Sequence, residues 1–152
     1  MDNVVKIHPV LGELRWDNQL SWWETELEFL PGYSIYFSLD DEKNQPDEVF
    51  SAGVKYLEWA RTAELACREQ IAFDLLETYN EIWANADPDD GGPGVKTKEA
   101  FLTGIQLSSI TRHSDGSGVW YYEDGEEELF GGHSIEIWVS ENGVFSGAHL
   151  AG

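Results

Sequence analysis

The sequence contains one long stretch of helical periodicity, residues 46–86, with strand-like patterns on both sides of it. Phe50, Val54, Leu57 and Arg61 recur at steps of three and four residues. After Thr62 the spacing resumes in an apolar set (Leu65, Ala72, Leu75, Leu76, Tyr79, Ile82, Trp83), with a polar set behind it (Glu64, Arg68, Glu69, Asp74, Glu77, Glu81). The pattern predicts two helices, or one helix broken near Arg61–Thr62.

The flanking segments alternate between apolar and polar side chains, which is typical of half-buried strands. Residues 10–39 predict three strands, and turn signals at Asp115-Gly116 and Asn142-Gly143 divide residues 105–150 into further strands. Thr97 predicts the N-cap of a short helix. The order predicts a single α+β domain, residues 1–152, whose antiparallel sheet of about six strands comes from two meanders (residues 10–39 and 105–150). The helical pair (46–86) packs on one face of this sheet.

The chain carries 29 acidic and 9 basic residues, a formal charge of −20. A hydrophobic content of 41% is that of a folded protein, so the acidity does not indicate disorder. This charge repels nucleic acid and anionic membranes and attracts basic partners. Solubility alone is the alternative explanation of the charge.

The sequence shows no sign of export or membrane insertion. The N-terminus lacks the apolar segment of a signal peptide, and no run of 18 apolar residues exists. Cys67 is the single cysteine, so an internal disulfide is excluded, and we expect a small, partly buried thiol. We therefore expect a soluble cytoplasmic protein.

The open face of the sheet is the candidate site. If Trp23, Leu27, Phe29, Ile35, Phe37, Ile135, Ile137 and Val139 point to the helices, residues of the opposite parity point to solvent. Aromatic rings interleaved with carboxylates suit arginine and lysine side chains. The candidate partner-binding residues are Trp22, Glu24, Glu26, Glu28, Tyr36, Trp120, Tyr122, Glu126, Glu127 and Trp138. The pattern leaves open which ring of Trp120-Tyr121-Tyr122 faces the core, and whether a second copy of the chain covers this face in a homodimer.

No motif for catalysis, a cofactor or a metal stands out. The acidic segment Asp87–Gly92 breaks the ligand alternation of a calcium loop and predicts a solvated turn. His133 and Ser134 are neighbours on one strand, so they point to opposite faces and do not form a catalytic pair. The preceding Gly131-Gly132 predicts a bulge or a tight turn into the strand. We expect no cofactor and no metal, and the question of enzymatic activity stays open, with the balance against it.

Several segments resemble a family of small acidic bacterial proteins that is classed as a domain of unknown function. They are His8–Asp17 (HPVLGELRWD), Leu75–Trp83, Phe101–Ile105, Gly131–Ile135 with its GHSI stretch, and Ala148–Gly152. The Gly131–Ile135 piece is the most specific. The resemblance implies one α+β domain in a bacterial cytosolic protein and assigns no catalytic residue. It also suggests a structural role for His133, with its ring bonded to a neighbouring loop carbonyl.

These features favour a non-enzymatic acidic binding protein of the immunity or antitoxin type, which would engage a basic protein partner such as a toxin by steered association. One alternative is a small hydrolase or ligand-binding enzyme with a pocket near His133. Another is a protein that imitates the charge of DNA to counter a defence system. Neither nucleic acid nor a membrane is an expected partner.

Overall fold

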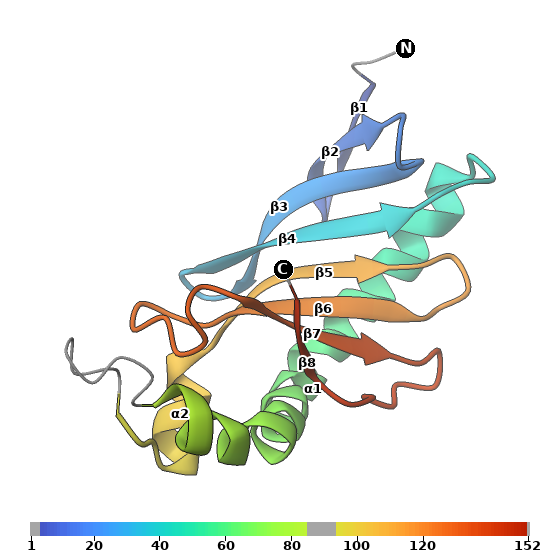
Figure 1. Cartoon of the computed structure of the whole chain (residues 1–152). Helices are drawn as coiled ribbons and strands as arrows, with labels where there is room; N and C mark the ends of the chain where they lie inside the picture. The colour runs from blue at the N-terminus through green and yellow to red at the C-terminus, as the bar shows by residue number, and fades with distance from the viewer. Residues whose placement is uncertain (1–3, 85–93, 152) are drawn as a thin grey trace.

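The computed structural model describes residues 4–84 and 94–151. A single eight-stranded sheet, with its strands in sequence order, is crossed on one face by a long helix (Figure 1). The strands are β1 (Val5–His8), β2 (Gly12–Asp17), β3 (Trp22–Leu30), β4 (Tyr33–Asp40), β5 (Gln106–Arg112), β6 (Gly118–Glu123), β7 (Ser134–Val139) and β8 (His149–Ala151). The helices are α1 (Pro46–Thr78), its π-helical continuation η1 (Tyr79–Trp83) and α2 (Lys98–Gly104).

The α+β architecture is confirmed, and the strand count and one pairing are corrected. The sheet has eight strands rather than six, because short edge strands lie at both ends of it. β1 has only four residues, Val5-Lys6-Ile7-His8, and is paired with β2 alone, so its alternation is too short to stand out in the sequence. Seven neighbouring pairs form the sheet, and the central pair, β4 with β5, is parallel. The crossover through α1 returns the chain to the same end of the sheet, which a hairpin cannot do.

α1 is one continuous helix, so the predicted break near Arg61–Thr62 is wrong. Arg61 instead fastens the helix to the end of β3: its Nε donates to the Phe29 carbonyl at 2.7 Å, and its Nη2 donates to the Glu28 carbonyl at 2.9 Å. The side of α1 that faces the sheet therefore runs without interruption through Leu57, Ala60, Cys67 and Ile71, all buried.

Continuity of the helix changes which residues it buries. Leu65 and Ile82, predicted to face the core, are 61% and 62% exposed. Glu64 and Arg68, predicted to face solvent, lie largely covered and form an ion pair at 2.5 Å. Arg68 Nη1 also donates to the carbonyls of Leu102 (2.6 Å) and Ile105 (2.7 Å). Arg68 thus ties α1 to the end of α2, where the chain turns into β5.

The start of α1 is fixed by a buried carboxylate. Asp41 Oδ1 accepts a hydrogen bond from the Gln45 backbone N–H at 2.7 Å, and Asp41 Oδ2 accepts one from the Trp23 indole at 2.9 Å. Pro46 follows at the first helical position, where its missing N–H costs nothing. The end of β4 and the start of α1 therefore share one hydrogen-bonded anchor.

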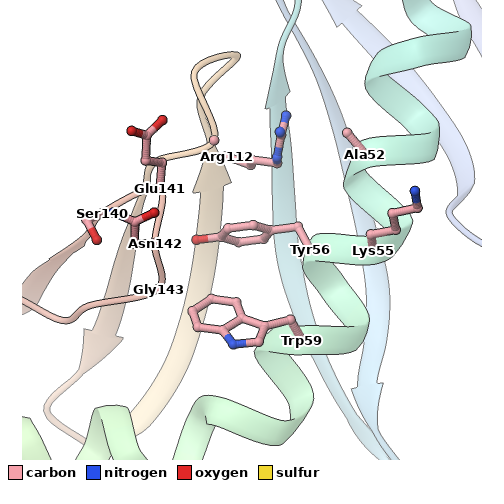
Figure 2. A pocket seen from close by; sticks show the side chains of 10 residues that line it. Ala52, Lys55, Tyr56, Trp59, Arg112, Ser140, Glu141, Asn142 and Gly143 are labelled. Atoms are coloured by element: carbon pink, nitrogen blue, oxygen red, sulfur yellow. The ribbon is translucent and has the colours of Figure 1, made fainter.

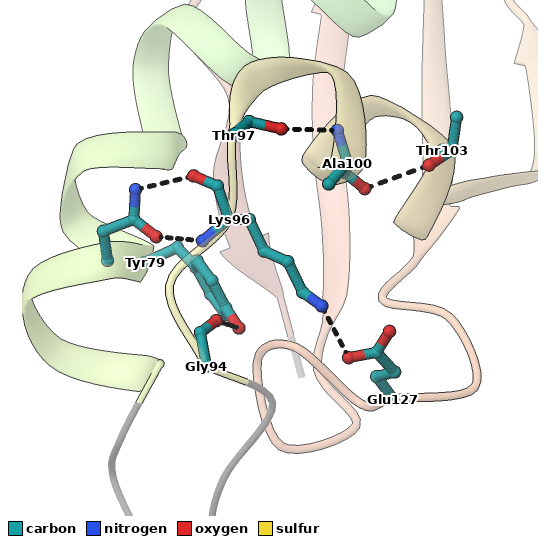
Figure 3. A network of polar contacts seen from close by, with 8 residues as sticks. Tyr79, Gly94, Lys96, Thr97, Ala100, Thr103 and Glu127 are labelled. Atoms are coloured by element: carbon teal, nitrogen blue, oxygen red, sulfur yellow. Dashed lines mark hydrogen bonds and ion pairs between the residues drawn. The ribbon is translucent and has the colours of Figure 1, made fainter.

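The region after α1 is held by polar contacts (Figure 3). The Tyr79 hydroxyl donates to the Gly94 carbonyl at 2.7 Å, and the Asn80 side chain forms two hydrogen bonds with the Lys96 backbone. Thr97 caps α2 by accepting from the Ala100 N–H at 3.2 Å, as predicted. The predicted solvated turn at 87–92 lies outside the described residues. Within the described ranges, no helix is long and apolar enough to cross a membrane.

Candidate functional site

The face of the sheet opposite α1, here called the open face, follows the predicted parity on three strands. Seven of the eight residues predicted to point inward from β3, β4 and β7 are at most 2% exposed, and Leu27 is half-buried. Their strand neighbours Glu24, Glu26, Glu28, Tyr36 and Trp138 are exposed, and Trp22 is half-exposed. The tight helix-facing layer explains this outcome, because a slip of one residue would bury the whole row of carboxylates.

Cross-strand pairing places the outward side chains in continuous rows over the sheet. One row follows the pairs Glu26, Tyr36, Ser109, Tyr121, Glu136 and His149, from β3 to β8. A second row follows Arg15, Glu24, Ser38, Thr111, Val119 and Trp138, from β2 to β7, in which Thr111 and Val119 are buried. Side chains in such directly opposed positions are near enough to interact. The rows bring Tyr36, Tyr121 and Trp138 onto one surface with the carboxylates.

Each outward indole is hydrogen-bonded to a carboxylate two residues away on its own strand. The Trp22 indole N–H donates to Glu24 Oε1 at 2.6 Å, and the Trp138 indole N–H donates to Glu136 Oε1 at 2.7 Å. A hydrogen bond to Glu26 raises the pKa of the Tyr36 hydroxyl. These bonds hold the rings in place beside a negative charge.

Glu136 is the most enclosed carboxylate of this surface, with its side chain 15% exposed. Its Oε1 also lies 3.0 Å from Nε2 of His149. Burial alone raises the pKa of Glu136, but hydrogen bonds from Trp138, Tyr121 and His149 outweigh burial, and the net pKa is lowered. The ionised form is therefore the one that the site stabilises. The His113 ring stacks on Trp138, with centroids 6.2 Å apart and planes 17° apart.

Trp120 and Tyr122 do not lie on this surface, so the prediction that they are exposed is wrong. Both are 0% exposed beneath α1. The Trp120 indole donates to the Tyr56 hydroxyl at 2.9 Å, and the Arg68 guanidinium lies over the Tyr122 ring at 5.6 Å. Tyr121 is the residue that faces outward. Strand β6 has bulky side chains on both faces, so only its pairing with β5 and β7 determines which of them face the helix and which face solvent.

Glu126 and Glu127 lie in the loop between β6 and β7, away from Trp22. Trp22 pairs with Asp40 at the end of the sheet where β6 begins, with β4 and β5 between Trp22 and β6, whereas this loop follows the opposite end of β6 (Figure 1). Glu127 forms an ion pair with Lys96 at 2.8 Å (Figure 3). The ten predicted residues therefore divide into six on the open face, two in the core and two in this loop.

The Gly131-Gly132 pair serves the tight turn that was predicted before β7. Both residues have positive φ, +67° and +89°, which favours glycine. Asp124, which is buried, accepts hydrogen bonds from the backbone N–H groups of Phe130 (2.9 Å) and Gly132 (2.7 Å). The His133 ring packs edge-on against Trp83 at 5.9 Å, and among the described residues it has no hydrogen-bond partner. Within residues 4–84 and 94–151, His133 therefore packs on a ring, and the predicted bond to a loop carbonyl is not found there.

Tyr121, His113 and His149 are members of this surface that the sequence did not point to. The signal for Tyr121 was its place between Trp120 and Tyr122, but the parity of that strand could not be assigned. His113 directly follows β5 and His149 begins β8. Neither could be placed on this face from the sequence, because the pairing of those strands is known only from the fold. Within the part of the chain that the structure describes, no three or more His, Cys, Asp or Glu side chains gather as a metal site would require.

Comparison with known proteins identifies a family. A family model described as "Uncharacterized protein conserved in bacteria (DUF2262)" matches residues 8–150. No curated protein and no solved structure matches the chain.

Proposed function

We propose that this chain, which belongs to the DUF2262 family of uncharacterised proteins conserved in bacteria, is a non-enzymatic binding protein that engages a basic protein partner through the open face. The partner class that suits it is a cationic toxin, for example a nuclease. The chain would then act as an immunity protein or antitoxin, by covering the positively charged surface of that toxin.

The observation that carries this proposal is the pairing of exposed rings with carboxylates. Trp22 with Glu24 and Trp138 with Glu136 each offer a flat ring whose N–H is already bound to a neighbouring negative charge. An arginine guanidinium can stack on such a ring while it donates to the carboxylate beside it. Rings held in place before binding lose less conformational entropy when a partner docks.

The overall charge supports the same partner class. A formal charge of −20 gives a long-range field that accelerates encounter with a cation and slows encounter with an anion. At physiological salt this field is screened beyond about 8 Å, so the association rate should fall as salt is added.

The two other functions have less support. A protein that imitates DNA would present carboxylates spaced like phosphates, whereas the carboxylates on the open face are separated by rings and serines. A hydrolase centred on His133 would need a base or an acid beside the ring, whereas Trp83 packs there.

The test compares two triple variants with the same change in net charge. E24Q/E26Q/E136Q neutralises the open face, and E58Q/E69Q/E77Q neutralises exposed positions on α1. Binding of fluorescent hexa-arginine and hexa-lysine peptides is measured by anisotropy over a salt series. We expect wild type and the α1 variant to bind hexa-arginine more tightly than hexa-lysine, and the open-face variant to lose at least about tenfold in affinity. Equal losses in both variants, or equal affinity for the two peptides, would show that only net charge is recognised.

The same three proteins then serve as baits in a bacterium that encodes the family. A basic protein captured by wild type and the α1 variant, but not by the open-face variant, is the expected partner. A captured partner that is acidic, or one that the open-face variant retains, contradicts the proposal.

A further inference from the structure

Arg112 differs from the other arginines of the chain in having no side-chain partner among the described residues. Arg15 and Arg68 form ion pairs with Glu13 and Glu64, and Arg61 donates to backbone carbonyls. Arg112 is nevertheless half-buried at the end of β5, in register with the buried Leu39 and therefore on the side of the sheet that α1 covers. A half-buried cation without a partner loses hydration and gains no compensating bond.

Arg112 lines a cavity of about 430 Å³, a volume within the range of small-molecule sites. The cavity lies between the first half of α1 and the turns that follow β5 and β7. Lys55 and Glu141 also line it, so its lining carries two cations and one carboxylate, while on its other side Arg112 borders a groove lined by Asp41, Glu48 and Asp115. In a protein with a charge of −20, a locally positive cavity stands out. Its charge favours an anion.

The base of the cavity is aromatic. Figure 2 shows the side chains of Tyr56 and Trp59 projecting from α1 towards the turn that carries Asn142 and Gly143. The two rings have centroids 5.5 Å apart, and Phe145 stacks on Trp59 at 6.1 Å and 19°. Trp59 is thereby fixed while it still lines the cavity. Because Phe145 takes one face of Trp59, only the other face is left to stack against a planar group.

Glycine at position 143 keeps the turn close to this ring. Its φ is +79°, and a Cβ there would lie 2.9 Å from Cζ2 of Trp59. The adjoining Asn142 and Glu141 present polar atoms on the same turn, and Glu141 can accept hydrogen bonds from hydroxyl or amino groups. The cavity therefore combines a ring platform, a cationic side and a polar rim.

We propose that this cavity binds a small anion that carries a planar ring and hydroxyl groups, the chemistry of a nucleoside monophosphate. The base stacks on Trp59 and Tyr56, the phosphate pairs with Arg112 and Lys55, and the sugar hydroxyls donate to the turn at Glu141 and Asn142. This site lies on the helix-covered side of the sheet, and the proposal is independent of the open face and its partner.

The test uses AMP as the probe, with adenosine (ring without charge) and inorganic phosphate (charge without ring) as its two halves. Titrations are followed by NMR, which reports the Trp59 indole and the Gly143 amide separately. We expect saturable AMP binding that shifts both signals, with an affinity at least about tenfold above that for adenosine and for phosphate. Absence of saturation up to about 5 mM AMP, or phosphate binding as tightly as AMP, overturns the proposal.

Arg112→Gln should weaken AMP binding at least about tenfold, since a phosphate contact to arginine is charge-assisted. Lys98→Gln, which removes an exposed lysine from α2, is the control and should leave AMP affinity unchanged. Equal affinity in the two variants also overturns the proposal. Circular dichroism checks their folding, and if Arg112→Gln fails to fold, Lys55→Gln replaces it with the same expected loss.

Discussion

The indole nitrogen of Trp138 lies 2.7 Å from Glu136 Oε1, on the same strand and the same face of the sheet. This one bond combines the two features from which we infer a binding face: an exposed ring and a charge that orients it. It also links that surface to His149, whose Nε2 is 3.0 Å from the same oxygen. Glu136 is therefore expected to contribute both to the stability of the fold and to the proposed binding face.

Glu136 should contribute stability that depends on pH. Hydrogen bonds lower its pKa in the folded state, so its ionised form stabilises the fold above the pKa of the unfolded chain, about 4.3. This contribution is lost as pH falls through the lower folded pKa. We expect Glu136→Gln to cost about 1 kcal/mol of unfolding free energy at neutral pH and less as the pH approaches about 3. Urea unfolding at both pH values measures the difference, and exposed Glu141→Gln is the control. A cost that does not change with pH would contradict the assignment.

Trp120 and Trp138 should respond differently to the same substitution. Trp120→Phe removes a buried indole and leaves the Tyr56 hydroxyl without its donor, so we expect a loss of about 1–3 kcal/mol. Trp138 is 45% exposed, and Trp138→Phe should change stability by less than about 0.5 kcal/mol. Chemical denaturation of the two variants decides the matter. Similar losses would mean that the two faces of the sheet are wrongly assigned.

Arg68 should be the most sensitive basic residue of the helix. Arg68→Gln removes the bonds to the Leu102 and Ile105 carbonyls and leaves Glu64 without its partner. We expect a loss of about 3–5 kcal/mol, because breaking one side of a covered ion pair leaves a charge uncompensated. The double variant Arg68→Gln/Glu64→Gln should recover part of this loss in urea unfolding. A double variant as unstable as the sum of the single ones would argue against coupling.

Cys67 should be inert in the folded protein. Burial raises the pKa of its thiol to about 12, so the reactive thiolate is scarce at pH 8. We expect Ellman's reagent to react slowly with the native protein and at the rate of a free thiol in guanidinium chloride. Rapid reaction in the native state would place Cys67 at the surface.

The predictable parts of the fold are those that local sequence controls. In β3, β4 and β7 the inward positions are apolar except for Thr25 and the outward positions are mostly polar, so the inward faces could be assigned from the sequence. The cap at Thr97 and the positive-φ glycines at Gly116 and Gly143 follow from local backbone chemistry in the same way. The resemblance to a bacterial family was also correct, since the family model spans residues 8–150.

Long-range contacts decided the rest. Arg61 was predicted to lie at a helix break, but it donates to the carbonyl of Phe29. Arg68 was predicted to face solvent, but it donates to the carbonyls of Leu102 and Ile105. These carbonyls are about thirty or more residues away in sequence, so local sequence could not reveal the contacts. The parity of Trp120, Tyr121 and Tyr122 depended on the strands beside them, because a run of three large rings has no polar member to mark the outer face.

The sequence alone determined that the chain is acidic, that its fold is α+β, and that its alternating strands have one apolar and one polar face, since side-chain direction in a strand has a period of two. Only the tertiary structure decided which rings reach solvent beside Glu136 and that Arg112 meets Trp59 across a cavity. Both depend on strand pairing and on the unbroken course of α1, which bring together residues far apart in the chain.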